Sequence, residues 1–298
     1  MFDPNNNPPQ RQGGSIKGRL LIALGIALVG LFMYWNQTEE NPITGEKQHV
    51  AISPDQEKIL GLESAPKMAA EMGGDLPDSD IRTQKVKEVG KYIVDHTIKD
   101  KSPWDFNFHL LADDKTINAF ALPGGQIFLT LGLYNRLQNE SQLAGVLGHE
   151  IGHVIERHTS EQMAKNQLGQ WLIVAVATGA SDPTQGNSNN AAVIAQVVNQ
   201  VIQMRYSRKD ESEADLWGLK LMERIGYDPR AMVHVMEVLK SAGGGGSGIE
   251  MFQTHPDPDL RIEQINAYLK ENPPPPNAKE GRPLPKGESN PRNSIFDY

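Results

Sequence analysis

The stretch Gly148-His149-Glu150-Ile151-Gly152-His153 decides how this chain folds and works. It places two histidines four residues apart, with a glutamate between them. On an α-helix the two imidazoles lie one turn apart on the same face, so both can reach a single metal ion. Glu150 lies about 100° further round the helix and can face a metal-bound water. The stretch therefore predicts a helix that carries a metal site.

The flanking residues favour a helix here. Asn139 is a suitable N-cap, with Gln142 three positions later. Apolar side chains then recur at helical spacing, at Leu143, Val146, Leu147, Ile151 and Val154. By the same angular count His158 lies about 180° from His149, so we interpret it as a helix-end residue and not as a ligand. The alternative, two polar histidines on an amphipathic helix without a metal, is disfavoured by a second motif downstream.

The His-Glu-x-x-His spacing is typical of zinc metallopeptidases, in which the middle glutamate is the general base. Zinc in a hydrolase usually keeps three protein ligands and one open position. Glu211 and Asp215 share one helical face with the later apolar positions, whereas Glu213 shares a charged face with Lys220 and Arg224. This periodicity favours Glu211 as the third ligand and Asp215 as the acceptor of a hydrogen bond from a ligand histidine. The alternative is a set of surface acids that suit a helix N-terminus.

These motifs together resemble the gluzincin-type zinc metallopeptidase family of the CAAX prenyl protease, HtpX and the periplasmic BepA and LoiP proteases. The chain looks closest to the periplasmic branch with a soluble catalytic domain. The resemblance spans about residues 41–270, and it implies a zinc-dependent endopeptidase with Glu211 as third ligand. The other matching segments are Asn41-Pro-Ile-Thr-Gly45, Asn118-Ala-Phe-Ala-Leu-Pro-Gly-Gly125, Tyr206-Ser-Arg208, and Thr254-His255-Pro256 with Arg261.

Two further site predictions rest on this resemblance. In the family the segment around Asn118, Ala119, Phe120 and Ala121 comes just before the metal helix, so it is a candidate sheet edge for binding substrate as an added strand. An ordinary hairpin is the equal alternative. His255 lies near the active-site cleft in the family, where it could stabilise the oxyanion or occupy the open zinc position. An incidental histidine in a helix-entry turn is the alternative reading.

Composition limits the partners and the ligands. The net charge of −8 argues against a nucleic-acid partner, because phosphate binding needs a basic surface. The chain has no cysteine, so any metal must bind histidines and carboxylates.

The N-terminal region predicts a membrane anchor. Leu20 to Trp35 carries no charge, and it follows Lys17 and Arg19. The positive-inside rule then keeps the N-terminus cytoplasmic and the rest of the chain outside. A cleaved signal peptide is the alternative, but no small-residue cleavage site follows. We expect a single-pass protein of the inner (cytoplasmic) membrane, with its catalytic domain facing the periplasm or the outside.

The remaining chain divides into elements of both kinds. Helices are expected from Pro54 to about Ala65, from Asp78 to Thr97 and from near Pro258 to about Lys270, and strands at 106–111, 117–122 and 126–131. Two short apolar stretches, 171–180 and 191–201, are interpreted as buried or cleft-covering helices, with a re-entrant hairpin as the alternative. The expected divisions are a disordered cytoplasmic segment 1–19, a transmembrane anchor 20–38, a zinc metallopeptidase domain 39–270 and a Pro-rich disordered tail 271–298.

The expected fold class is therefore α+β: a helix-dominated, zincin-like domain with a small sheet beside the metal helix, plus one N-terminal transmembrane helix. One Zn²⁺ per chain, on His149, His153 and Glu211, would activate water for peptide hydrolysis with Glu150 as base. The expected substrates are misfolded or membrane-associated proteins in envelope quality control. The alternatives are a zinc-stabilised, chaperone-like binding module with little proteolysis, which would not need Glu150, and a metallohydrolase of non-peptide substrates.

Overall fold

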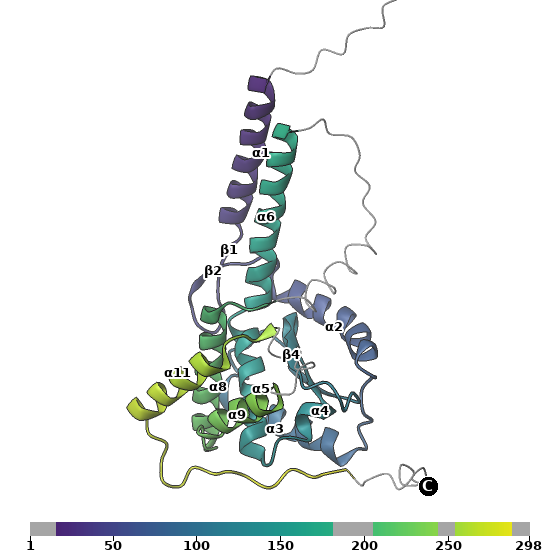
Figure 1. Cartoon of the computed structure of the whole chain (residues 1–298), viewed down its shortest axis with the longest axis vertical. Coiled ribbons are helices and arrows are strands. Elements are labelled where there is room, and N and C mark those ends of the chain that lie inside the picture. The colour runs from purple at the N-terminus through teal and green to yellow at the C-terminus, as the bar shows by residue number, and fades with distance from the viewer. Residues whose placement is uncertain (1–15, 181–204, 244–253, 288–298) are drawn as a thin grey trace, which may run out of the picture.

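The computed structural model describes residues 16–180, 205–243 and 254–287 (Figure 1). Three parts of the expected divisions lie outside the described residues: positions 1–15 of the segment 1–19, the apolar stretch 191–201, and the end of the tail, 288–298. In chain order the described elements are α1 (Ile16–Asn36), β1 (Thr38–Glu40), β2 (Lys47–His49), α2 (Pro54–Glu71), α3 (Ile81–Thr97), β3 (Asn107–Leu111), β4 (Ala119–Leu122), the 3-10 turn η1 (Pro123–Gly125), β5 (Gln126–Thr130), α4 (Leu131–Tyr134), α5 (Glu140–Ile155), α6 (His158–Ala180), α8 (Arg208–Ile225), α9 (Ala231–Gly243) and α11 (Pro258–Glu271).

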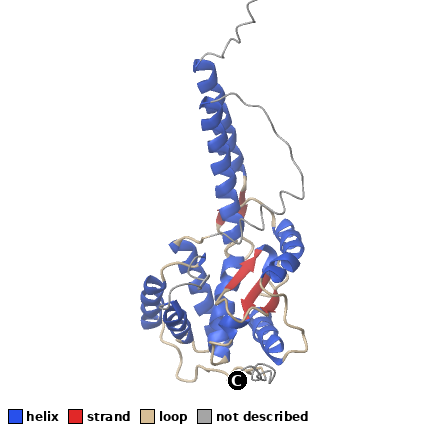
Figure 2. Ribbon diagram, turned by 45° about the vertical axis from the view of Figure 1, so that its right-hand side comes forward, coloured by secondary structure: helices blue, strands red, loops and turns tan. Residues whose placement is uncertain are grey.

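The body is a helix-dominated α+β domain with a small sheet, as the sequence predicts (Figure 2). The sheet has the order β3-β5-β4, in which β3 runs parallel and β4 antiparallel to the central strand β5. The short connection from β4 to β5 is possible because Gly124 and Gly125 adopt positive φ angles of 80° and 97°. The sheet contacts helix α5, which carries the His-Glu-x-x-His motif, through β4 and β5.

Helices α5 and α8 pack closely because small residues face each other. A Cβ atom placed on Gly152 would lie 2.9 Å from the Cα of Ala214, and one on Gly148 would lie 3.1 Å from the Cα of Gly218. Every residue of α5 is buried, including the polar ones. This close approach brings the first turns of α8 to the histidines of α5.

Helices α1 and α6 run side by side away from the body (Figures 1 and 2). Gly30 allows the contact, since a Cβ there would lie 2.6 Å from the Cβ of Trp171. Leu172, Ile173 and Val174 of α6 are exposed, so the expectation that residues 171–180 are buried or cover a cleft is wrong for these three. α6 is a single helix of 23 residues that begins at His158. Within the part of the chain that the structure describes, none of the helices has the length and apolar character needed to cross a bilayer.

The C-terminal segment differs from expectation. Leu284 is 4% exposed and belongs to the main core, and Tyr134 donates a hydrogen bond to the carbonyl of Pro285. Arg282 bonds Glu140, the first residue of α5. Residues 279–286 therefore pack along the body, and the prediction of a disordered tail is wrong for them. Composition does not reveal this packing, because one buried leucine and a few hydrogen bonds suffice to hold a Pro-rich segment against the domain.

Candidate metal centre

Helix α5 holds the two motif histidines in the expected relation. Its N-cap is Asn139, whose side chain accepts a hydrogen bond from the backbone N–H of Gln142, as the sequence predicts. The Nε2 atoms of His149 and His153 lie 3.0 Å apart, and both residues are 2% exposed. The helix thus directs two imidazole nitrogens to one point.

Helix α8 brings two carboxylates to the same place. Ser207 caps this helix in a capping box with Asp210. Glu211 is 1% exposed, and its two oxygens each lie 3.5 Å from the Nε2 atom of a motif histidine. Asp215, one turn later, lies 2.8 Å from the Nδ1 atom of His149. The inward face predicted for Glu211 and Asp215 is confirmed by their burial.

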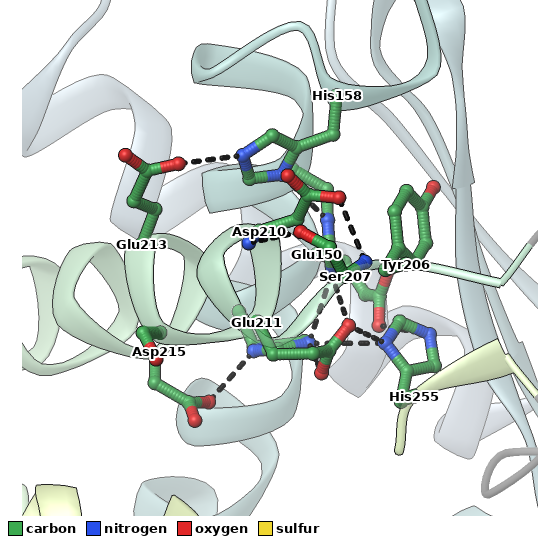
Figure 3. A network of polar contacts seen from close by, with 12 residues as sticks. Glu150, His158, Tyr206, Ser207, Asp210, Glu211, Glu213, Asp215 and His255 are labelled. Atoms are coloured by element: carbon green, nitrogen blue, oxygen red, sulfur yellow. Dashed lines mark hydrogen bonds and ion pairs between the residues drawn. The ribbon is translucent and has the colours of Figure 1, made fainter. Parts of the chain in front are cut away.

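His255 completes the cluster from a distant part of the sequence (Figure 3). Its Nδ1 atom lies 2.9 Å from an oxygen of Glu211 and 3.3 Å from Nε2 of His149. The chain turns just after it, because Asp257 has a left-handed φ of 58° before α11 begins. His255 is 1% exposed.

The donor set fits a zinc ion. Possible ligand atoms of His149, His153, Glu211 and His255 all lie within 4.8 Å of one another. Tetrahedral ligands about 2.0–2.1 Å from zinc are themselves roughly 3.3 Å apart, close to the 3.0–3.5 Å separations found here. Imidazole nitrogens and a carboxylate oxygen are the ligands that zinc takes in a chain without cysteine.

Arg261 of α11 fixes both carboxylates of α8. Its Nη1 atom lies 2.8 Å from Glu211, and Nε and Nη2 bond both oxygens of Asp215. Burial raises the pKa of Glu211, but the charges of His255 and Arg261 outweigh it and hold that pKa well below its usual range. Burial likewise opposes ionisation of Asp215, and Arg261 overcomes it, so the pKa of Asp215 is lowered. Both acids are therefore held as carboxylates.

Glu150 lies beside the cluster without a partner of its own. It is fully buried, and neither oxygen has a hydrogen-bond partner among the described residues. The nearest cationic candidate is Nε2 of His255, 3.8 Å from Oε1 of Glu150. Burial raises the pKa of Glu150, which suits a group that must take up a proton.

Comparison with known proteins identifies the family of the chain that carries this cluster. The model of peptidase family M48 matches residues 80–269. The chain belongs to peptidase family M48, and it is a metalloprotease. The resemblance noted in the sequence is thereby confirmed.

Three relatives illustrate the range of this M48 family. The mitochondrial metalloendopeptidase OMA1 of Schizosaccharomyces pombe is 30% identical over 272 residues, which cover 91% of this chain and 75% of that protein. The beta-barrel assembly-enhancing protease of Escherichia coli K12 is 34% identical over 186 residues, 60% of this chain and 37% of that protein. Human mitochondrial metalloendopeptidase OMA1 is 29% identical over 269 residues, 85% and 50% of the two chains. The chain thus spans half or less of the last two.

Two aromatic side chains of this M48 domain were not predicted to contact the site. His158 begins α6, as a helix-end residue should, but its Nδ1 atom lies 2.8 Å from Nδ1 of His153. Tyr206 stacks on the ring of His153, with the centroids 4.0 Å apart. The segment containing Tyr206 was part of the family resemblance, so its motif was the available signal. For His158 the angular count pointed away from the site.

The predicted substrate edge has a clear position in the sheet. β4 pairs only with β5 among the described strands, so it is an edge strand. Asn118, Ala119, Phe120 and Ala121 are at most 9% exposed, and the side-chain oxygen of Asn118 has no partner within the described chain. β4 also contacts α5, which carries the metal motif. A role in binding substrate stays a prediction.

Proposed function

We propose that this chain is a zinc-dependent endopeptidase. One zinc ion binds His149, His153 and Glu211, and Glu150 is the general base. The observation that carries the proposal is the buried cluster of three ligands with an unpartnered carboxylate beside it. A zinc-stabilised binding module would need the cluster but would not need Glu150.

The chain's own residues have separate tasks in this reaction. A bound zinc ion lowers the pKa of water and polarises the scissile carbonyl. Glu150 accepts the proton of the attacking water and passes it to the leaving amine, a task that its raised pKa favours. Asp215 accepts a hydrogen bond from the Nδ1–H of His149, which leaves Nε2 of that ring free to bind metal.

His255 has two proposed roles. Its Nδ1 atom contacts both Glu211 and His149, which supports a fourth donor that fills the open zinc position and keeps the enzyme latent. Its Nε2 atom lies toward Glu150 and has no partner in the described chain, which supports a donor to the oxyanion. The two roles predict opposite effects of removing the imidazole.

The substrate is proposed to be a polypeptide bound as an added strand beside Asn118–Ala121. Main-chain hydrogen bonds at a sheet edge suit many sequences, as an enzyme for misfolded proteins requires. The names of the relatives, a beta-barrel assembly-enhancing protease and mitochondrial metalloendopeptidases, support a role in quality control at a membrane. We therefore propose substrates that are misfolded or membrane-associated, outside the cytoplasm.

The proposed location is the inner membrane, with residues 20–38 as anchor and residues 39–270 as the peptidase domain. The support is a set of apolar side chains on α1 that no other described part of the chain covers. They are Leu20, Leu21, Ile22, Leu24, Leu28, Val29, Phe32 and Trp35. Trp35 and Tyr34 stand where α1 meets the body, and such aromatic residues favour a membrane interface.

Cleavage of unfolded casein by the purified full chain tests the proposed activity. We expect hydrolysis that a chelator abolishes and added zinc restores. Glu150→Gln should keep one zinc per chain and lose activity, by a factor of at least about 10². Full zinc occupancy without any cleavage by the wild-type chain would instead favour the chaperone-like binding module, which suppression of casein aggregation would then reveal.

A further inference from the structure

The two motif histidines are held by different partners. His149 is fixed through its Nδ1 atom by Asp215, which Arg261 holds in turn. Among the residues that the structure describes, no carboxylate contacts Nδ1 of His153; Glu211 lies near its Nε2 atom only. The Nδ1 atom of His153 faces a second imidazole, that of His158, at 2.8 Å. The structure therefore raises the question of what fixes the proton of His153.

The geometry allows only one arrangement of protons if Nε2 of His153 binds metal. Two ring nitrogens 2.8 Å apart must share one proton. Because Nε2 of His153 faces the cluster, the proton of this ring lies on its Nδ1 atom. His153 Nδ1–H then donates a hydrogen bond to the lone pair on Nδ1 of His158. His158 then carries its own proton on Nε2, which lies 3.3 Å from Oε2 of Glu213 (Figure 3). The other oxygen of Glu213 pairs with Lys209 at 2.9 Å.

We propose that His158 and Glu213 are positioning residues for His153. They fix its ring and its tautomer through a relay from imidazole to imidazole to carboxylate, so that Nε2 remains available for zinc. This inference rests on the proposed function, because it assumes His153 as a ligand. It assigns to Glu213, on the outer face of α8, the task that Asp215 performs for His149.

The turn between α5 and α6 holds His158 rigidly for this task. Arg157 has a left-handed φ of 55°, which redirects the chain so that His158 turns back onto His153. The Arg157 side chain is fully buried and bonds Glu57, Glu39 and the carbonyl of Ile52. A residue with a strained backbone and three side-chain contacts indicates that the turn holds His158 in one position.

A second metal site is the competing reading of the same side chains. Atoms of His158, Asp210 and Glu213 lie close enough together to hold a cation. Each is already engaged, however. Asp210 accepts a hydrogen bond from the backbone N–H of Ser207, Glu213 pairs with Lys209, and Nδ1 of His158 faces His153. The relay uses these contacts as they stand, whereas a cation would have to replace them.

Zinc affinity of the full chain, measured by competition with a chromogenic chelator, tests the relay. His158→Phe keeps a ring of similar size but has no nitrogen to accept from His153, so zinc should bind about 10–100-fold more weakly. His158→Asn should recover most of the affinity, because its amide oxygen can take the place of Nδ1. His96→Phe is the matched control, since His96 is exposed on α3 and should leave zinc affinity unchanged.

The outcomes separate the relay from its alternatives. Wild-type affinity in His158→Phe, or equal losses in the Phe and Asn variants, would overturn it. Loss of a second zinc equivalent, with the first still tightly bound, would also overturn it and indicate the metal site. The nitrogen chemical shifts of the zinc-loaded chain should show the Nδ1–H tautomer of His153, and this signature should change in His158→Phe while the fold is retained. Failure of the ligand assignment itself would appear elsewhere, as a His153→Ala variant that still binds zinc.

Discussion

Each proposed ligand side chain of the candidate centre is restrained by a neighbour that comes from another segment. Glu211 is the most tightly surrounded, with Arg261 on one oxygen and His255 on the other. Glu211→Gln keeps the size of the side chain and removes its charge. Since two histidines alone bind zinc weakly, we expect the dialysed variant to contain much less than one zinc per chain by atomic absorption.

Glu237→Gln is the control for this prediction. Glu237 is exposed on α9 and lies outside the cluster, so its variant should keep one zinc per chain under the same dialysis. Full zinc occupancy in Glu211→Gln would show that the third ligand has been assigned to the wrong acid.

His255→Ala separates the two roles of this histidine by the sign of the effect. An imidazole that fills the open zinc position competes with water and substrate, so its removal should raise the rate of casein cleavage. An imidazole that stabilises the oxyanion contributes mainly in the transition state, so its removal should lower kcat by roughly 10²–10³. An unchanged rate, with fold and zinc content preserved, would mean that His255 is structural.

The sequence could predict the residues whose position follows from one helix. Counting about 100° per residue placed Glu211 and Asp215 inward and Glu213 outward; the first two are buried, and the side chain of Glu213 is 30% exposed. The same count failed for His158, because it assumed that α5 continues. The helix ends at Ile155, and left-handed Arg157 returns the chain to the site. No periodicity reveals Arg261, which reaches the centre from a separate helix 46 residues after Asp215.

At the level of elements, the contact between α5 and α8 sets the distance between the histidines and Glu211. Gly152→Ala would place a methyl group 2.9 Å from backbone atoms of Ala214, so α8 must move. We expect a loss of stability of about 1–3 kcal/mol, as for other overpacked sites, together with weaker zinc binding. Urea unfolding and chelator competition measure the two effects.

Gly169→Ala is the matched control for this helix contact. Gly169 lies within α6, and a Cβ there meets nothing within 4 Å. Alanine should stabilise this helix by up to about 1 kcal/mol and leave zinc binding unchanged. Equal effects of the two substitutions would show that the close approach of α5 and α8 does not set the site.

The cap of α3 gives a pH-dependent prediction. Asp80 accepts from the backbone of Arg82 and pairs with its guanidinium, and these bonds lower the pKa of Asp80 to about 2. A lowered pKa stabilises the fold above the unfolded value near 3.8, and this contribution is lost as the pH falls from about 4 to 2. Asp80→Asn keeps a good cap but removes the charge, so it should cost at most about 1 kcal/mol at pH 7. Urea unfolding at pH 7 and pH 3.5 should show that the difference in free energy of unfolding between the wild type and Asp80→Asn is smaller at pH 3.5. An equal difference at both pH values would contradict the electrostatic explanation.

Element boundaries were predictable where a side chain caps a helix. Asn139 caps α5 as its sequence context predicts, and α2 begins at Pro54 as expected, with Ser53 as its cap. The end of α2 was not predictable in the same way. The helix was expected to stop near Ala65 but runs through Pro66 to Glu71. Met68 and Ala69 are buried in this last part, so tertiary packing sustains turns that local propensity disfavours.

At the scale of the whole molecule, the M48 match begins at residue 80, after α1 and α2. The chain nevertheless ties these earlier elements to the catalytic body. Glu57 of α2 accepts bonds from Trp104, Arg157 and Ser160, and so links the N-terminal region to the turn that carries His158. Glu39, which follows α1, also pairs with Arg157. The segments after α1 and the start of α6 therefore meet at the turn beside the candidate metal centre.

The proposed anchor can be tested with single cysteines, because the chain has none of its own. Leu28→Cys on α1, Ile173→Cys on α6 and Lys101→Cys on the body would carry an environment-sensitive fluorophore, and the full chain would be added to phospholipid vesicles. Leu28 and Ile173 are 56% and 69% exposed, so a label at either position is free to enter lipid. We expect the emission of the label at 28 to shift to the blue and that of the label at 101 to remain unchanged. A shift at 173 would extend the lipid-embedded surface to α6, since this helix packs against α1 through Trp171 and Gly30. A label at 28 that stays in water would overturn the anchor, whatever the label at 173 reports.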